Sequence, residues 1–156
     1  MKKINILFAF AFISLAAIAA TSWKPTTGSV VFHIKNAGIT VDGSFKGLAA
    51  SIKFDENDLA NSSIYASVKS ATVNTGIDKR DEHLRKDEYF DVANHPTATL
   101  KIIRVTNVEG NKHLVSAALT IKGTTMAIDF PMTYEVKEGK LGASATMEID
   151  RTLYGI

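Results

Sequence analysis

The densest group of residues able to do chemistry lies in residues 74–96, NTGIDKRDEHLRKDEYFDVANHP, where charged side chains crowd together and β-branched residues are few. Such a cluster forms either a polar catalytic site or a charged cap that fixes one segment of the chain. No other part of the sequence pairs with it, so we favour a salt-bridged cap that closes one end of the fold. The side chains assigned to this structural motif are Arg80, Asp81, His83, Leu84, Arg85 and Phe90.

The four histidines, His33, His83, His95 and His113, fall in separate elements and show no spacing typical of a metal site. His83 and Asp87 are four positions apart and would share one helical face, which allows a two-ligand site. A solvated helix face is the favoured interpretation, and the sequence predicts no metal centre.

Other catalytic patterns are absent from the sequence. There is no G-x-S-x-G elbow, no P-loop and no dinucleotide-binding fingerprint. The sequence has no cysteine, which excludes disulfides, thiolate catalysis and a lipid-modified N-terminal cysteine. We therefore predict that the protein is not an enzyme, that it has no catalytic residues and that it needs no cofactor.

Residues 1–20 have the pattern of a secretory signal peptide: Lys2 and Lys3 precede an apolar run that ends in small residues. An uncleaved anchor helix is the alternative, but the run is short for a membrane span. Without this segment the chain carries 16 basic and 16 acidic residues. A net charge near zero disfavours nucleic-acid binding. We expect a periplasmic or secreted protein with no membrane span after cleavage.

Most of the remaining chain alternates apolar and polar residues with a period of two, which is typical of half-buried strands. About eight short strands joined by turns indicate an all-β sandwich or a closed antiparallel barrel, and periodicity does not choose between them. Residues 78–88 interrupt the pattern with helix-forming composition, so we predict a short helical crossover with Asp78 as its N-cap. The expected strands cover residues 29–35, 39–45, 47–54, 64–69, 97–102, 114–121, 126–136 and 141–150.

Alternation also assigns one set of apolar side chains to a common interior. From the residues alone, a solid core without a cavity is the simplest interpretation of this set. The members are Phe32, Ile34, Ile52, Phe54, Ile64, Val68, Leu100, Ile102, Leu119, Ile121, Ile128, Phe130 and Met132.

Six short blocks, in order along the chain, resemble the YceI-like family of polyisoprenoid-binding proteins. The central block is the charged segment itself, with its TG, RDEHLR, YFD and HP pieces. The resemblance covers residues 24–156, which we take as one lipid-binding domain. The other blocks lie at residues 30–35, 43–47, 62–64, 119–123 and 149–156.

This resemblance implies an elongated, lipocalin-like antiparallel barrel that holds an isoprenoid chain along its apolar interior. Met132 is flexible enough to line an adaptable cavity. The chain departs from the family at two positions, since Asn36 and Lys122 stand where the family often has histidine. If those histidines contact a ligand head group in the family, this protein would prefer a different one.

In the family the Gly-Ile that matches Gly155-Ile156 is normally followed by another strand, so we expect a barrel lacking its final strand. An open edge of this kind favours pairing with a partner or with a second copy, giving a homodimer. The predicted function is a binding protein for a polyisoprenoid or similar long-chain amphiphilic lipid. The alternatives are an enzyme that acts on a lipid-like substrate through residues 80–85, and an interaction module that pairs through the open edge.

Overall fold

A computed structural model describes residues 21–36, 39–55 and 57–156 of the protein. The predicted signal peptide, residues 1–20, lies outside the described residues. The elements are β1 (Thr21–Trp23), β2 (Val30–Asn36), β3 (Ile39–Phe45), β4 (Ala49–Phe54), η1 (Leu59–Asn61), β5 (Ser63–Lys69), η2 (Ser70–Thr72), α1 (Asp78–Leu84), β6 (Thr97–Glu109), β7 (Lys112–Ile121), β8 (Thr124–Lys137), β9 (Lys140–Ala145) and η3 (Arg151–Tyr154).

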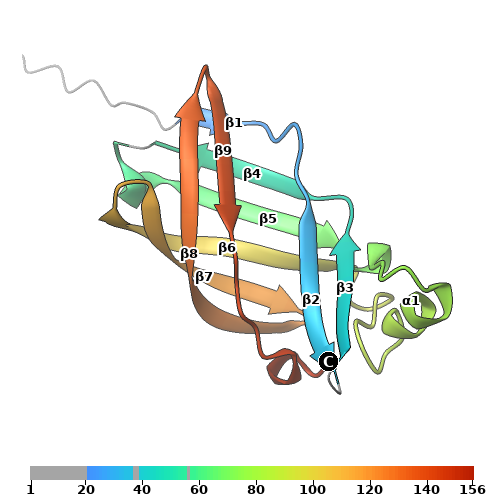
Figure 1. Ribbon diagram of the computed structural model, residues 1–156. Helices are drawn as coiled ribbons and strands as arrows, with labels where there is room; N and C mark the ends of the chain where they lie inside the picture. Colours follow the sequence, from blue (N-terminus) through green and yellow to red (C-terminus); the bar gives the residue numbers. More distant parts are fainter. Residues whose placement is uncertain (1–20, 37–38, 56) are drawn as a thin grey trace, which may run out of the picture.

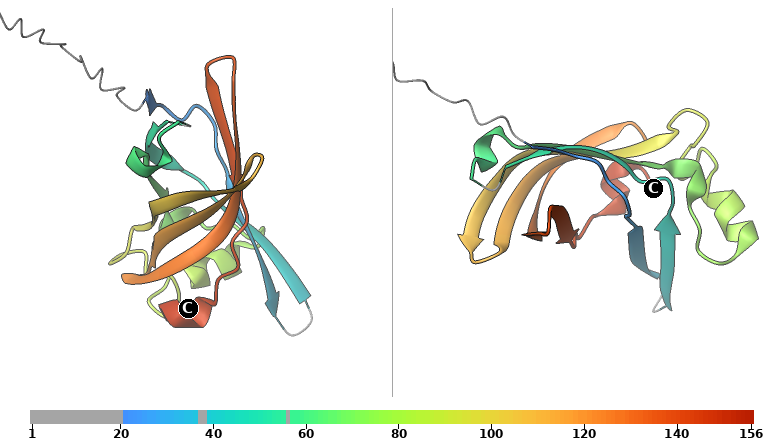
Figure 2. Two further views of the ribbon diagram at one scale, coloured as in Figure 1. Left: turned by 90° about the vertical axis from the view of Figure 1, so that its left-hand side faces the viewer. Right: turned by 90° about the horizontal axis from the view of Figure 1, so that it is seen from above.

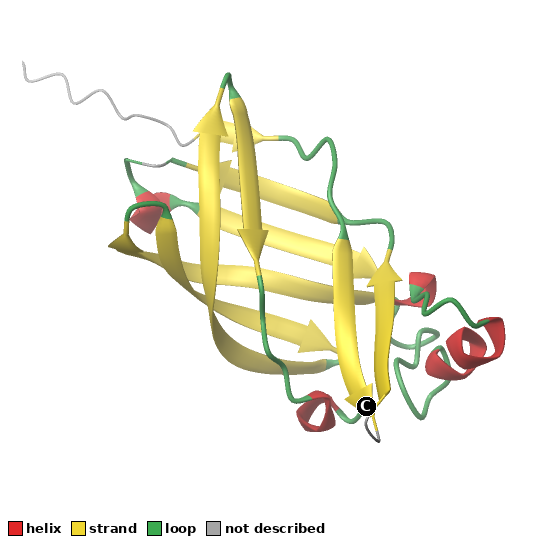
Figure 3. Cartoon of the chain, viewed as in Figure 1, coloured by secondary structure: helices red, strands yellow, loops and turns green. Residues whose placement is uncertain are grey.

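The described strands form two antiparallel sheets (Figures 1 and 3). One has seven strands in the order β1-β4-β5-β6-β7-β8-β9, and the other is the β2–β3 hairpin. Figure 2 shows that the larger sheet is strongly curved and that the β2–β3 hairpin and η3 lie on its concave side. The architecture is a nearly closed antiparallel barrel with one short α-helix, so the predicted all-β, lipocalin-like fold is confirmed.

Some predicted element boundaries are wrong. The strand expected over residues 141–150 ends at Ala145, after which the chain leaves the sheet and enters η3. Ile77, not Asp78, occupies the N-cap position of α1. Asp78 is the first helical residue, where its carboxylate still complements the positive end of the helix dipole. The strand expected over residues 39–45 has the predicted bounds, and Gly43 lies inside it.

Register places the apolar side chains of the larger sheet on its concave face. Leu100 of β6 is opposite Leu119 of β7, and Leu119 is opposite Met126 of β8. A β-bulge between Ile102 and Arg104 breaks the simple alternation of β6. A bulge of this kind bends a strand and increases its twist, which favours the curvature of the sheet.

The β2–β3 hairpin is attached to the body by its second strand. Ser44 and Asn74 exchange two backbone hydrogen bonds, with N–O distances of 2.8 and 3.0 Å. The ring of Phe45 packs between Phe32 of the hairpin and Phe90 of the crossover, with both centroid distances at 5.4 Å. The hairpin therefore depends on the segment that follows β5.

Gly43 leaves room for the ring of Phe32 on the opposite strand. A Cβ atom at this position would lie 2.2 Å from Cζ of Phe32. We expect Gly43→Ala to displace the ring and to lower the free energy of unfolding by about 1–3 kcal/mol. Chemical denaturation of the wild type and the variant measures this change.

Gly142→Ala is the matched control, because a Cβ atom at Gly142 of β9 meets no atom closer than 3.9 Å. Its stability should stay the same or rise, since alanine reduces the freedom of the unfolded chain. Equal losses in the two variants would contradict the close packing of Phe32 on Gly43.

Candidate functional site

The concave face of the larger sheet is the candidate ligand-binding surface. The structure places all of the predicted interior residues on this face except Phe32 and Ile34, which belong to the β2–β3 hairpin. Those in the sheet are Ile52, Phe54, Ile64, Val68, Leu100, Ile102, Leu119, Ile121, Ile128, Phe130 and Met132.

This face is packed unevenly. Its buried members include Phe54, Ile102 and Phe130, and a dense cluster forms where β6, β7 and β8 meet. Other members of the same face, such as Ile52 and Ile121, are only half-buried. A filled core would bury the whole set, so the half-buried part offers apolar area that a bound ligand can cover.

Sequence reasoning missed several residues of this face. Val115 is fully buried on β7, and Val105 is buried on β6 after the bulge. His113 was treated only as an isolated histidine. Counting back in steps of two from Leu119 along β7 reaches Val115 and then His113, so the alternation itself contained the signal.

His113 is a polar residue on the apolar face. Its side chain is only 4% exposed, and its ring stacks on Tyr134 at a centroid distance of 4.3 Å. Tyr134 in turn meets Phe54 edge to face at 4.6 Å. Burial lowers the pKa of the His113 imidazole from its ordinary value of 6.5. The ring is therefore neutral at pH 7.

The predicted charged motif holds the segment that joins β5 to α1. Arg85 donates from Nε to the carbonyl of Ala71 at 2.9 Å and from Nη2 to that of Val73 at 3.1 Å. Arg80 donates from Nη2 to the carbonyl of Thr75 at 2.8 Å. Three carbonyls of this segment thereby receive charge-assisted hydrogen bonds.

Asp81 completes this arrangement from inside. It is 3% exposed and accepts hydrogen bonds from the backbone N–H and the hydroxyl of Thr75, the former at 2.9 Å. Arg80 also donates from Nε to that hydroxyl at 2.7 Å. Thr75 thus lies between the buried carboxylate and the guanidinium.

The expectation of a salt-bridged cluster is wrong for the described part of the chain. The ion pairs found there all involve histidine, among them His83 with Glu88 at 3.0 Å, and none joins Arg80 or Arg85 to a carboxylate. These arginines bind backbone oxygens instead, because the irregular segment they cover lacks a strand partner for those carbonyls.

The remaining motif residues lie around the helix. His83 is exposed and meets Tyr89 edge to face at 4.9 Å, whereas Leu84 is half-buried. Phe90 packs on Phe45 of the hairpin. In residues 21–36, 39–55 and 57–156, no group of three or more potential ligands is arranged to hold a metal ion.

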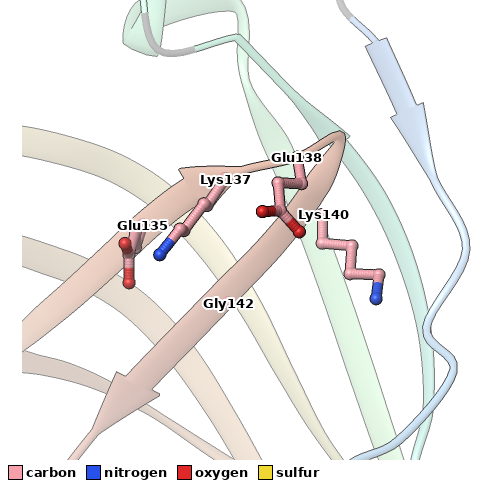
Figure 4. A pocket seen from close by; sticks show the side chains of 5 residues that line it. All are labelled: Glu135, Lys137, Glu138, Lys140 and Gly142. Atoms are coloured by element: carbon pink, nitrogen blue, oxygen red, sulfur yellow. The ribbon is translucent and has the colours of Figure 1, made fainter.

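Two shallow hollows lie along the β8–β9 hairpin. One, at the tip of the β8–β9 hairpin, is lined by the alternating charges of Glu135, Lys137, Glu138 and Lys140 around Gly142 (Figure 4). The other lies at the opposite end of this hairpin, beside the start of β7, and Met132 of the concave face is among the residues that line it. Solvated charges of this kind do not suit a long apolar chain.

We expect Asp81→Asn to destabilise the crossover, because a neutral amide oxygen is a weaker acceptor than the charged Oδ1 of Asp81, which takes both hydrogen bonds from Thr75. The loss should be about 1–3 kcal/mol in the free energy of unfolding, measured by denaturant titration. Glu82→Gln at the exposed neighbouring position is the control and should leave stability unchanged. A stable Asp81→Asn variant would show that Thr75 does not depend on the carboxylate.

The buried imidazole of His113 predicts a pH-dependent stability. Its pKa is lower in the folded protein than the 6.5 of the unfolded chain, so below pH 6.5 the unfolded state binds more protons. Stability is therefore complete above pH 6.5 and falls as the pH drops below it. His113→Phe should flatten the dependence of Tm on pH between about pH 7.5 and 5.

His33→Gln is the control for this measurement, because the His33 side chain is 67% exposed. It should leave the pH profile of the wild type intact. An unaltered profile in His113→Phe would assign the acid sensitivity to other groups.

No helix in the described part of the chain is long and apolar enough to cross a membrane. In a comparison with protein families, the model of the YceI-like domain matches residues 22–156.

Relatives of known sequence carry names of this family. A UPF0312 protein of Photorhabdus laumondii is 33% identical over 98 residues, which are 62% of this chain but only 50% of that protein. Protein YceI of Salmonella agona is 31% identical over 144 residues, 88% of this chain and 73% of its own. The chain thus spans about half to three quarters of the length of these relatives.

Solved structures match the fold. BcnA of Burkholderia cenocepacia superimposes with a TM-score of 0.75 at 24% identity, covering 81% of this chain and 79% of its own. The YceI protein of Campylobacter jejuni gives 0.67 at 30% identity, covering 79% and 76%. A domain of Saccharophagus degradans described as polyisoprenoid-binding gives 0.54 at 23% identity, covering 70% and 63%.

Proposed function

The chain belongs to the YceI-like family, and on that premise we propose that it is a binding protein for a polyisoprenoid or similar long-chain amphiphilic lipid. The lipid chain would lie along the concave face of the larger sheet. The polar end would remain at one end of the barrel. We further propose that the protein acts in the periplasm or outside the cell, as the signal-peptide pattern of residues 1–20 suggests.

The observation that carries the proposal is the half-buried state of one continuous apolar surface. Ile52, Ile64 and Leu100 lie on adjacent strands of the concave face, and each keeps part of its side chain exposed. Covering such a surface removes apolar area from water and so lowers the free energy of the complex. Each ligand methylene buried there contributes about 0.8 kcal/mol.

The shape of the surface favours an extended ligand. Inward residues of β7 recur at every second position from Val115 to Ile121, which is a spacing of about 7 Å per step. A flexible prenyl chain can follow such a row without any covalent chemistry. Binding of this kind needs no metal and no organic cofactor.

The alternative of an enzyme acting through residues 80–85 is less well supported. Arg80 and Arg85 direct their guanidinium groups to backbone carbonyls, and Asp81 is buried against Thr75. Groups engaged in this way hold the chain and are poorly placed to meet a substrate. We therefore propose a carrier and not a catalyst. Self-association through an open edge stays a prediction.

Native mass spectrometry tests the proposal directly. Protein purified from a host with membranes should carry an added mass that is released on denaturation and identified as a long-chain lipid. If the purified protein carries no ligand and takes up none after incubation with polyprenyl compounds, the proposed function is wrong.

A pair of variants localises the binding surface. Ile128→Asn puts an amide on the concave face and should weaken lipid binding about tenfold or more, because the amide loses water without gaining a partner. Ala127→Asn changes the adjacent, exposed residue on the other face and should bind normally. Circular dichroism of both variants checks that the fold is kept. Equal binding by the two would place the ligand elsewhere.

A further inference from the structure

The concave face contains one buried polar atom that the fold does not satisfy. Nδ1 of His113 is fully buried and has no hydrogen-bond partner among the described residues. Buried polar side-chain atoms nearly always have a partner, so an exception calls for an explanation. The hydroxyl of Tyr154 is also buried and unpartnered there, but it belongs to η3 and not to the apolar face of the sheet.

His113 stands at one end of the apolar face. It is the second residue of β7, directly after the turn that joins β6 to β7. In register it lies between Asn107 of β6, which is exposed, and Met132 of β8, which is buried. The neighbour of His113 on β6 is therefore in contact with solvent, and its neighbour on β8 belongs to the buried apolar surface.

The rest of β7 continues the same face without another polar group. Its inward residues after His113 are Val115, Ala117, Leu119 and Ile121. From His113 to Ile121 the strand rises roughly 27 Å. One strand thus presents a hydrogen-bonding group at its start and a row of apolar side chains along its length. This arrangement matches the polar head and the apolar tail of an amphiphile.

We propose that His113 binds the head group of the lipid through a neutral oxygen, a hydroxyl or a carbonyl, and so fixes the orientation of the ligand. The head would lie at the β6–β7 turn and the tail would run along β7 toward Ile121. This inference rests on the proposed lipid-binding function and adds the class of head group and the direction of the chain.

A neutral oxygen suits the surroundings better than an anion. The ring that stacks on His113 is that of Tyr134, and its register partners are Met132 and Asn107; none of the three carries a charge. A neutral imidazole has one N–H donor and one acceptor nitrogen, so either tautomer can meet a carbonyl or a hydroxyl. A phosphate would require a cation, which none of these three residues provides, and burying a phosphate unpaired is costly.

Aromatic side chains cover the ring of His113. Tyr134 covers one face of the His113 ring, and Phe54 meets Tyr134 from the side. A head group that reaches Nδ1 exchanges part of this aromatic cover for a hydrogen bond. The stacked ring also holds the imidazole plane in place, which orients its nitrogens.

Three probes of one chain length test the inference: geranylgeraniol, the hydrocarbon that lacks its hydroxyl, and geranylgeranyl monophosphate. Isothermal titration of the purified protein should show the alcohol binding about fivefold to tenfold more tightly than the hydrocarbon, which is what one net hydrogen bond provides. His113→Phe keeps an aromatic ring against Tyr134 and should abolish this preference. Its affinity for the hydrocarbon should stay the same or increase.

Two further variants separate a binding role from a structural one. His113→Asn keeps a polar group near the position of Nδ1 and should retain part of the preference for the alcohol. His33→Phe removes an exposed imidazole from β2 and should leave the preference intact. In the wild type, the imidazole ¹⁵N resonance of Nδ1 should shift with the alcohol and not with the hydrocarbon, a readout that does not depend on any variant folding.

The outcomes distinguish failure of the head-group assignment from failure of the proposed lipid-binding function. If alcohol and hydrocarbon bind equally, or if His113→Phe keeps the preference, the head-group assignment is wrong while lipid binding stands. If the monophosphate binds most tightly, the site recognises an anion and the assignment is again wrong. If none of the three probes binds, the proposed function fails, and this inference fails with it.

Discussion

The fold depends on how a short stretch of irregular backbone is satisfied. Between β5 and α1 the chain leaves the sheet, and its carbonyls at Ala71, Val73 and Thr75 lose their strand partners. Buried or half-buried peptide groups must find hydrogen bonds somewhere. Arg85 and Arg80 supply them from the helix that follows, so a local motif replaces the missing strand.

The same stretch also binds the β2–β3 hairpin, through the backbone hydrogen bonds between Ser44 and Asn74. Lys46 and Thr72 add one more bond at that point: the Thr72 hydroxyl accepts from the backbone N–H of Lys46 at 2.9 Å and donates its own proton to the carbonyl of Lys69 at 2.6 Å. The charged helix therefore holds the crossover in place, and the crossover in turn holds the hairpin. The charges that look most like a catalytic site bind backbone carbonyls of the crossover and so support the barrel.

Most residues of the apolar face could be predicted from the sequence, because side chains at every second position of a strand lie on the same face of the sheet. Ile52, Leu100 and Leu119 were assigned to one face by alternation alone, and strand pairing places them there. The role of Arg80 and Arg85 could not be deduced, since a pattern of charges does not show whether its partners are carboxylates or backbone oxygens. Val105 was missed for a different reason: the bulge after Ile102 shifts the parity of β6.

The bulge after Ile102 bends the sheet without changing which residues of β6 and β7 face the interior. Ile103 is the extra residue: it is 64% exposed and has no counterpart on β7, since Ile102 is opposite Ala117 and Arg104 is opposite Ser116. Removing it would leave every cross-strand pair and every inward side chain unchanged and would take away only the bend. At this position the bend of the sheet thus depends on chain length and not on side-chain chemistry. Insertions and deletions there, more than substitutions, would adjust the protein to thicker or thinner ligands.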